Sequence, residues 1–312
     1  MRIFIGFETG QPQGPRSGKP SGTPSLGSAR RPAGRTVVIA AAKGGAGTST
    51  LVANVGAALA LSGRKVGMVD ADLNAPTLGS ILGMKPLLRA PLSGRIDPWM
   101  GPLGISVVSS DILPEGEPLP VSFSESERME DVVPANGRPV AVDYCAALGR
   151  MLNESRLEDS GVVLVDLSPG VVSLLNLLKT TAPDAAVLVS TGGRSTIETT
   201  RTMAELLADS SVPLLGIVEN MTSFICDNCH SVRPLLPAGE LAGLARELEA
   251  PILGRLPFDP RLAQAGELGT IFVRSYPDAP VAKQMKAIAT GIASRLEELS
   301  EAQRTAASEQ QG

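Results

Sequence analysis

A glycine-rich turn near the start of the chain has the residue types that bind a phosphate group. Its residues are Lys43, Gly44, Gly45, Ala46, Gly47, Thr48, Ser49 and Thr50. The run before it, residues 36–42, suits a buried strand, and residues 50–61 have the apolar spacing of a helix. Glycines let backbone N–H groups converge on an anion, and the helix dipole adds to the attraction. The turn therefore predicts a nucleotide phosphate site. A ligand-free strand-to-helix turn is the less favoured alternative.

One residue of this turn departs from the usual phosphate-binding loop, or P-loop, which ends in Gly-Lys followed by Ser or Thr. Thr48 stands where that lysine would contact the outer phosphates, whereas Ser49 can still bind magnesium. Losing a hydrogen bond to a charged group costs about 1.5 to 3 kcal/mol, or about 10- to 100-fold in affinity or rate. We therefore expect nucleotide binding to survive and hydrolysis to be slow.

Carboxylates follow two apolar runs of the sequence. Asp70 and Asp72 come directly after residues 66–69, and Asp166 lies in the run 162–167. Ligands of open parallel sheets bind beyond the carboxyl ends of the strands. Asp166 suits a magnesium ligand, and Asp72 suits the acceptor that orients an attacking water. The alternative for any one of these three strand-end aspartates alone is that it caps the next helix or turn.

Two of the three cysteines, Cys226 and Cys229, form a Cys-x-x-Cys pair, and Cys145 lies far from them in the sequence. Two thiolates are half of a four-cysteine shell for zinc or an iron–sulfur cluster. With His230, the pair also spells a c-type haem attachment motif, which would need export and a haem pocket. A redox dithiol is a further alternative, but no helix N-terminus follows to lower a thiol pKa.

Apolar runs alternate with helix-length segments, which predicts an α/β fold with a mainly parallel sheet and helices on both faces. The remaining expected strands are residues 66–69, 105–108, 162–167, 185–189, 214–218 and 252–256. The remaining expected helices are residues 143–152, 196–208, 239–248 and 281–299. One nucleotide-binding domain over residues 36–299 would contain a flexible insertion (113–142) and a cysteine loop (221–235). We expect residues 1–35, rich in Gly, Pro and Ser, to be disordered, and residues 300–312 to fray.

The composition narrows the classes of function. Of the 312 residues, 43% are hydrophobic and 19% charged, with a net charge of −4. Residues 1–35 hold six basic residues and one acid, +5, so the remainder carries −9. An acidic body argues against broad nucleic-acid binding. No apolar run reaches the roughly 18 residues of a membrane span, and no signal peptide is evident, so we predict a cytoplasmic protein without a disulfide framework.

Taken together, these motifs resemble the Mrp-type (ApbC-like) iron–sulfur cluster carrier ATPases, a branch of the MinD/ParA-like P-loop NTPases. The resemblance spans residues 36–275. It is carried, in order, by the loop that starts with Lys43, Asp70-Ala71-Asp72-Leu73-x-x-Pro76 (switch I), Asp166-Leu167-x-Pro169-Gly170 (switch II), Val218-Glu219-Asn220-Met221, Cys226-x-x-Cys229, and Gly254-x-Leu256-Pro257-x-Asp259-Pro260.

The resemblance implies a homodimer that binds ATP and Mg²⁺ near its interface. Lys43 would be the signature lysine that assists catalysis, Asn220 would read the adenine edge, and Pro257 would pack on the base. The pairs of Cys226 and Cys229 from two chains would hold a bridging four-iron four-sulfur cluster, for delivery to apo iron–sulfur proteins, with zinc as an alternative occupant.

Two other functions stay open. A MinD/ParA-like positioning or assembly factor would use nucleotide without metal chemistry, and a small residue such as Thr48 also occurs in divergent pilus-assembly relatives of MinD. That class seldom needs the cysteine pair, and residues 297–312 lack the apolar stripe of a membrane-binding helix. A degenerate ATPase that binds a partner without turnover is the other. Ser168, where the family more often has a second proline, is a smaller departure.

Overall fold

The computed structural model describes residues 34–73, 75–85, 96–109, 144–226, 228–229, 231–236 and 240–309. The predicted insertion at 113–142, His230 and all of the predicted leader except Gly34 and Arg35 lie outside these residues. Arg35 is already part of the first strand and pairs with Asp184 at 3.0 Å. The first strand thus begins one residue before the predicted domain boundary at residue 36.

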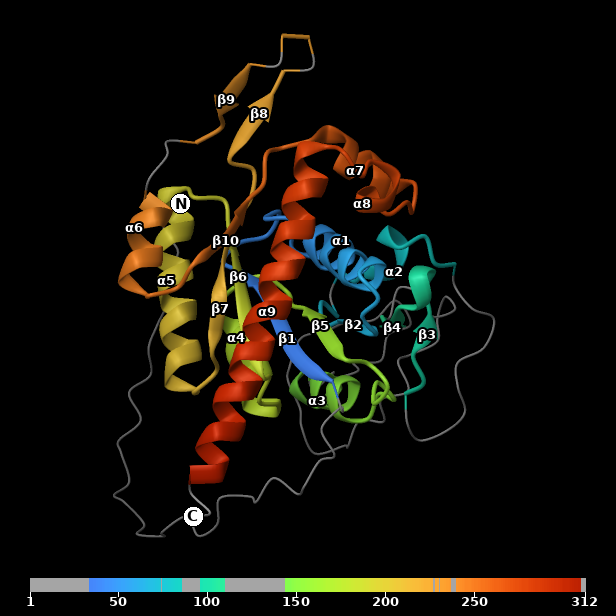
Figure 1. The fold of residues 1–312 in the computed structure, drawn as a ribbon, viewed down its shortest axis with the longest axis vertical. Helices are drawn as coiled ribbons and strands as arrows, with labels where there is room; N and C mark the ends of the chain where they lie inside the picture. Colours follow the sequence, from blue (N-terminus) through green and yellow to red (C-terminus); the bar gives the residue numbers. More distant parts are fainter. Residues whose placement is uncertain are drawn as a thin grey trace, which may run out of the picture. The chain divides into compact units, whose positions relative to one another are not determined.

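The alternation of apolar runs and helices produces an eight-stranded sheet within the described residues, in the order β10-β7-β6-β1-β5-β2-β4-β3 (Figure 1). All neighbouring pairs are parallel except β3 with β4. Its strands are β1 (Arg35–Ala41), β2 (Val66–Asp70), β3 (Trp99–Met100), β4 (Ser106–Val108), β5 (Val162–Asp166), β6 (Ala185–Ser190), β7 (Leu214–Glu219) and β10 (Ile252–Arg255). The predicted parallel sheet is confirmed.

Helices cover both faces of this sheet. They are α1 (Thr48–Leu61), α2 (Leu78–Ile81), η1 (Pro102–Gly104), α3 (Tyr144–Asn153), α4 (Val171–Thr180), α5 (Arg194–Asp209), α6 (Glu240–Glu247), α7 (Pro260–Glu267), α8 (Phe272–Ser275) and α9 (Pro280–Glu309). One core joins α1, α2, α7, α8 and α9 to one face of the sheet. A second core joins α3, α4, α5 and α6 to the other face. Alternate strand residues enter alternate cores, as with Val37 and Val38, because strand side chains point to opposite faces.

The strand register brings the acidic motifs together. In the pairing of β2 with β5, Asp70 lies opposite Asp166, and in the pairing of β1 with β5, Ile39 lies opposite Asp166. The carboxyl ends of β1, β2 and β5 therefore meet at one edge, where the glycine-rich turn also begins. The fold thus places every motif that follows these strands around one site.

Three elements differ from the sequence prediction. Helix α4 was not predicted; it buries Leu174 and Leu177, an i, i+3 pair, after the turn at Gly170. Helix α9 continues to Glu309, although we expected fraying from residue 300; residues 301–309 are rich in strong helix formers such as Ala, Glu and Gln. The cysteine segment is a two-stranded antiparallel hairpin, β8 (Ser223–Ile225) with β9 (Val232–Pro234), rather than an irregular loop.

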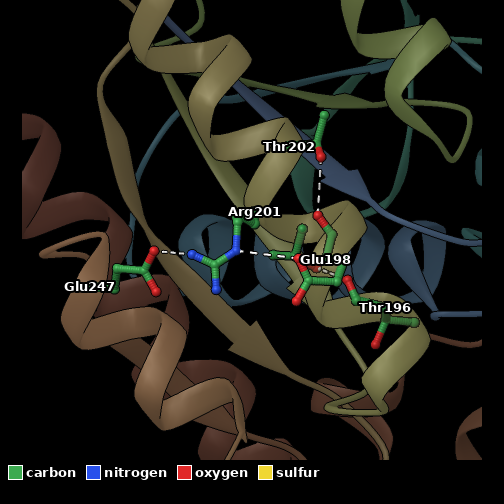
Figure 2. A network of polar contacts seen from close by, with 6 residues as sticks. Thr196, Glu198, Arg201, Thr202 and Glu247 are labelled. Atoms are coloured by element: carbon green, nitrogen blue, oxygen red, sulfur yellow. Dashed lines mark hydrogen bonds and ion pairs between the residues drawn. The ribbon is translucent and has the colours of Figure 1, made fainter.

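Polar contacts join α5 and α6 on one face of the sheet (Figure 2). Arg201 on α5 forms an ion pair with Glu247 on α6 and a second one, at 3.5 Å, with Glu198 on its own helix. Within α5, Thr202 Oγ1 donates to the Glu198 carbonyl. These contacts attach α6, which follows the cysteine hairpin in sequence, to the body of the domain. No helix in the described part of the chain has both the length and the apolar character to cross a bilayer.

Candidate functional site

The glycine-rich turn wraps around the N-terminus of α1. Gly45 and Gly47 have φ values of 77° and 83°, in the left-handed region where a side chain is strained. Gly47 directly precedes α1 and accepts the first helical hydrogen bond, from Leu51 N at 2.9 Å. Glycine occupies both positions because few other residues adopt this backbone conformation without strain. Its N–H groups are left at the positive end of the helix.

A cleft of about 510 Å³ opens beside this turn. All eight residues of the turn, 43–50, line it. The other walls come from switch I and α2, switch II and α7, namely Asp72, Thr77, Ser80, Ile81, Leu167, Pro169, Leu262, Ala263, Gly266 and Glu267. The P-loop, both switch segments and α7 therefore share one cavity.

Lys43 and Thr48 are the two positions of the turn that bear on the positive charge available to a phosphate, in a cleft that Asp72 and Glu267 also line. Thr48 is the first residue of α1, where it half faces the cleft, so the position of the missing lysine is directly at the ligand space. Lys43 is exposed, and within the described residues its side chain forms no hydrogen bond or ion pair. Its ammonium group is thus available to a phosphate.

Asp166 and Ser49 have the donor set for magnesium. Asp166 is 1% exposed and lies beside the Ser49 side chain. Its Oδ2 has no hydrogen-bond partner among the described residues. Burial, followed by the charge of Asp70, raises the pKa of Asp166 to about 8. A buried carboxylate oxygen without a partner, next to a hydroxyl, is a fitting pair of hard oxygen ligands for a divalent cation.

Asp70 has the structural, capping role that the sequence left open as the alternative for a strand-end aspartate. Its carboxylate accepts four hydrogen bonds of 2.9 to 3.1 Å, from the backbone N–H groups of Asp72, Thr77 and Leu78 and from the Ser109 hydroxyl. Burial raises its pKa to about 6, against the lowering effect of these donors. Asp70 thus shapes switch I and caps the start of α2. The feature of the sequence that indicates this capping role is the position of Asp70, at the end of a strand and directly before a turn that ends at Thr77.

Asp72 lies on switch I and faces the cleft. Its Oδ1 accepts a hydrogen bond from Ser168 Oγ at 2.7 Å and one from Ala75 N at 3.3 Å. Ser168 is 6% exposed, and the residues around it are fixed to β1 by Gly170 N donating to Ala41 O at 2.8 Å. Switch II therefore holds the carboxylate that we predicted to orient water.

Asn220 and Pro257 are not among the described residues that line the cleft. Asn220 directly follows β7 and donates from Nδ2 to the Ala46 carbonyl of the P-loop at 2.7 Å. Pro257 is half-buried between Leu256, whose N–H donates to Glu219 O, and Phe258, which bridges to Phe224. The structure thus brings Asn220 to the P-loop and Pro257 to the base of the hairpin.

Strands β8 and β9 form the cysteine hairpin, residues 223–234 (Figure 1). Cys226 and Cys229 follow β8 and precede β9 in the sequence. Cys226 N donates to Ser231 O at 3.1 Å. Cys229 is exposed, and its Sγ lies 3.1 Å from Ser231 Oγ. Hydrogen bonding to Ser231 lowers the pKa of the Cys229 thiol. Among the described residues, no three His, Cys, Asp or Glu side chains gather into a group that could hold a metal ion.

A family model for the NUBPL iron-transfer P-loop NTPases, of the ParA group, matches residues 33–134 and 138–293. The chain belongs to this family. The match covers the P-loop, both switch segments and the cysteine hairpin, and it confirms the resemblance that the motifs indicated.

The names of relatives of this NUBPL-family chain refer to iron–sulfur clusters. An iron-sulfur cluster carrier protein from Saccharolobus solfataricus is 27% identical over 253 residues, covering 80% of each chain. A cytosolic Fe-S cluster assembly factor NUBP2 homolog from Culex quinquefasciatus is 28% identical over 260 residues, covering 82% of this chain and 96% of the relative. Both alignments cover most of the chain rather than the P-loop alone.

Solved structures resemble the NUBPL-family fold. A nucleotide-binding protein from Archaeoglobus fulgidus, in complex with ADP, matches with a TM-score of 0.61 at 26% identity, over 80% of this chain and 90% of that one. The cell division ATPase MinD from Pyrococcus furiosus matches with a TM-score of 0.60 at 22% identity, over 84% and 99%. The second likeness shows the fold alone, and both agree with the predicted P-loop NTPase architecture.

The α7 wall of the cleft was missed by sequence reasoning. Helix α7 starts with Asp259, whose Oδ1 accepts from Arg261 N at 3.0 Å, and with Pro260 in its first turn. An Asp-Pro pair of this kind is a helix start signal. It was available in the sequence as part of the family motif, but it does not by itself place Leu262 and Glu267 at the nucleotide cleft.

Proposed function

We propose that this chain is an ATP-binding carrier of iron–sulfur clusters. The observation that carries the proposal is the position of Cys226 and Cys229, at the accessible turn of a hairpin that is attached beside the P-loop. Thiols in such a place can bind a cluster and release it without any opening of the protein core. The carrier and assembly-factor names of the relatives support the same cargo.

A homodimer would complete the cargo site. Four cysteine thiolates hold a four-iron four-sulfur cluster, and each chain supplies two. A twofold axis that passes near the hairpin turns would bring two pairs together. The lowered pKa of the Cys229 thiol favours the thiolate that binds metal. The cluster would then pass to apo iron–sulfur proteins by exchange of one cysteine ligand after another.

The nucleotide would bind in the cleft, with its phosphates on the backbone N–H groups of residues 44–50. A bound Mg²⁺ would neutralise phosphate charge, and Ser49 and Asp166 would hold it. Asp72 would orient the attacking water, and Lys43 would assist at the outer phosphates. Because Thr48 supplies no cation, we propose slow hydrolysis.

The base would lie toward Asn220 and Pro257. An asparagine side chain has two N–H donors and two acceptor lone pairs. Asn220 uses one donor for Ala46 O and one lone pair for Met221 N. One donor and one lone pair remain, which is the complement that an adenine edge requires. We propose that the carrier acts in the cytosol, where thiols stay reduced, as the name of the Culex relative states for that protein.

Anaerobic reconstitution with iron and sulfide tests the cargo site. Wild type should take up iron and sulfide and turn brown, whereas Cys226→Ala should lose most of both. Cys145→Ala is the matched control, because Cys145 lies on α3, outside the hairpin. If wild type and Cys226→Ala held equal iron and sulfide per chain, the carrier mechanism would be abandoned. A zinc content that replaces iron in anaerobically purified protein would point to a dimer-bridging zinc instead.

Thr48 favours one alternative, a MinD/ParA-like positioning or assembly factor that uses nucleotide binding without metal. That function would survive Cys226→Ala, since it needs no thiols. Nucleotide-dependent dimerisation, measured by light scattering for wild type and Cys226→Ala, separates the two. Dimerisation in both proteins, with no iron in either, would favour the positioning factor.

A further inference from the structure

The Asn220 side chain is bonded to the P-loop at Ala46 and to Met221, which leads into the cysteine hairpin. Its backbone N–H donates to Ser190 O at 2.8 Å, which fixes it to the end of β6. Its side chain donates to Ala46 O at 2.7 Å, although the two residues are 174 positions apart in the sequence. The P-loop is therefore attached by a direct hydrogen bond to the segment that leads into the hairpin.

The chain between Asn220 and the hairpin has little freedom. Met221 has φ 56°, a left-handed conformation that is uncommon for a residue with a side chain, and its N–H donates to Asn220 Oδ1 at 2.9 Å. Thr222 is held by two bonds to Leu256 O, from its N–H at 3.0 Å and its hydroxyl at 3.2 Å. Strand β8 then begins at Ser223. A displacement of Asn220 reaches the hairpin within three residues.

The contact of Asn220 with the P-loop is also close in space. A Cβ atom placed on Gly47 would lie 2.6 Å from Asn220 Nδ2, nearer than side chains tolerate. Ala46, which accepts the hydrogen bond, is 6% exposed. A P-loop that adjusts around a triphosphate must therefore carry Asn220 with it or break the bond to Ala46.

We propose that Asn220 is a positioning residue that transmits the nucleotide state of the P-loop to the cysteine hairpin. It does so by holding Ala46 with one end of its amide and Met221 with the other. This inference rests on the proposed function, because it gives ATP binding a route to the bound cluster. It adds to any contact of Asn220 with the base, and the two roles are separable.

The test uses the reconstituted, cluster-loaded full chain and a colorimetric iron chelator as the acceptor. The rate of iron loss is measured without nucleotide and with saturating Mg-ATP, and the ratio of the two rates is the readout. When two sites are coupled, a ligand at one typically changes the affinity at the other by about 5- to 150-fold. We expect such a ratio for wild type and a ratio near one for Asn220→Asp, which keeps an oxygen for Met221 N but loses the donor to Ala46. Asn220→Ala, which loses both contacts, should behave in the same way.

Thr222→Val is the matched control. It removes the hydroxyl bond to Leu256 O at the base of the hairpin but leaves the P-loop contact intact. It should keep the wild-type ratio. A ratio near one in Thr222→Val as well would mean that any loosening of the hairpin has this effect, and would overturn the role of Asn220.

Two other results would also overturn it. One is a wild-type ratio in Asn220→Asp at saturating nucleotide with only the preference for ATP over GTP lost, since Asn220 would then act on the base alone. The other is a ratio near one in wild type. The iron content before chelation reports separately on the carrier function, so a coupling that fails in well-loaded protein leaves that function standing.

Discussion

Raising the pH should destabilise the nucleotide-free protein, because Asp166 keeps a proton in the folded state that it loses on unfolding. Burial raises its pKa from 3.8 to about 8. The stability from this group is fully present below the unfolded pKa and is lost as the pH rises through the folded pKa. The window therefore runs from about pH 4 to about pH 8. Asp70, with a pKa of about 6, acts only in the lower part of it.

The size of the effect follows from the number of protons. Between about pH 6.5 and pH 7.5, the folded protein binds about one proton more than the unfolded chain through Asp166, which corresponds to about 1.4 kcal/mol per pH unit. Urea unfolding in EDTA, at several pH values, measures it. The slope should disappear in Asp166→Asn and persist in Asp278→Asn, a control at a carboxylate that is 94% exposed.

Mg²⁺ and ATP supply the second half of this test. A cation next to Asp166 favours its ionised form, so the slope of unfolding free energy against pH should flatten when both are present. Equal slopes in wild type and Asp166→Asn without ligand would refute the reasoning. The carboxylate would then titrate at its ordinary pKa, and the argument for a protonated, cation-accepting site would fail with it.

Three further changes test the site and the fold. Thr48→Lys adds the missing cation in the first turn of α1 and should tighten Mg-ATP binding about 10- to 100-fold in calorimetry; unchanged binding and hydrolysis would contradict our account of Thr48. Ser168→Ala removes the hydroxyl that donates to Asp72 Oδ1 at 2.7 Å and should slow ATP hydrolysis about 10-fold while the Kd for ATP is preserved. Ser168→Thr, which retains the hydroxyl, is the control. A weaker Kd with unchanged turnover would assign Ser168 to binding. Leu164→Ala, at a fully buried position of β5, should lower the unfolding free energy by about 2 to 5 kcal/mol, and a loss well under 1 kcal/mol would argue against the packing described.

The sheet and its main helices could be predicted from the sequence because the period of apolar residues changes with each element. Strands buried on both faces, such as β5, read as unbroken apolar runs, and helices such as α5 show apolar residues three and four apart. Helix α4 was missed because Val171 and Val172 continue an apolar stretch after a proline and a glycine. The hairpin was missed because β8 and β9 have three residues each and are little buried, so they leave no periodic signal.

The candidate site was predictable where the chemistry depends on residue type and not where it depends on contacts. Gly47, Ser49 and Asp166 stand in motifs whose spacing already indicates their surroundings. The bond from Ser168 to Asp72 and the bond from Asn220 to Ala46 join residues 96 and 174 positions apart. Such pairs depend on strand order and register, which a single sequence does not reveal.

The hairpin enters and leaves the domain at neighbouring points, since Leu235 N donates to Thr222 O at 3.1 Å. Changing the length of a segment with joined ends is inexpensive, about 0.6 kcal/mol for each doubling. The cysteine hairpin could therefore be replaced by another segment while the P-loop cleft is kept. We expect chimaeras that carry a differently shaped segment in place of residues 223–234 to remain folded.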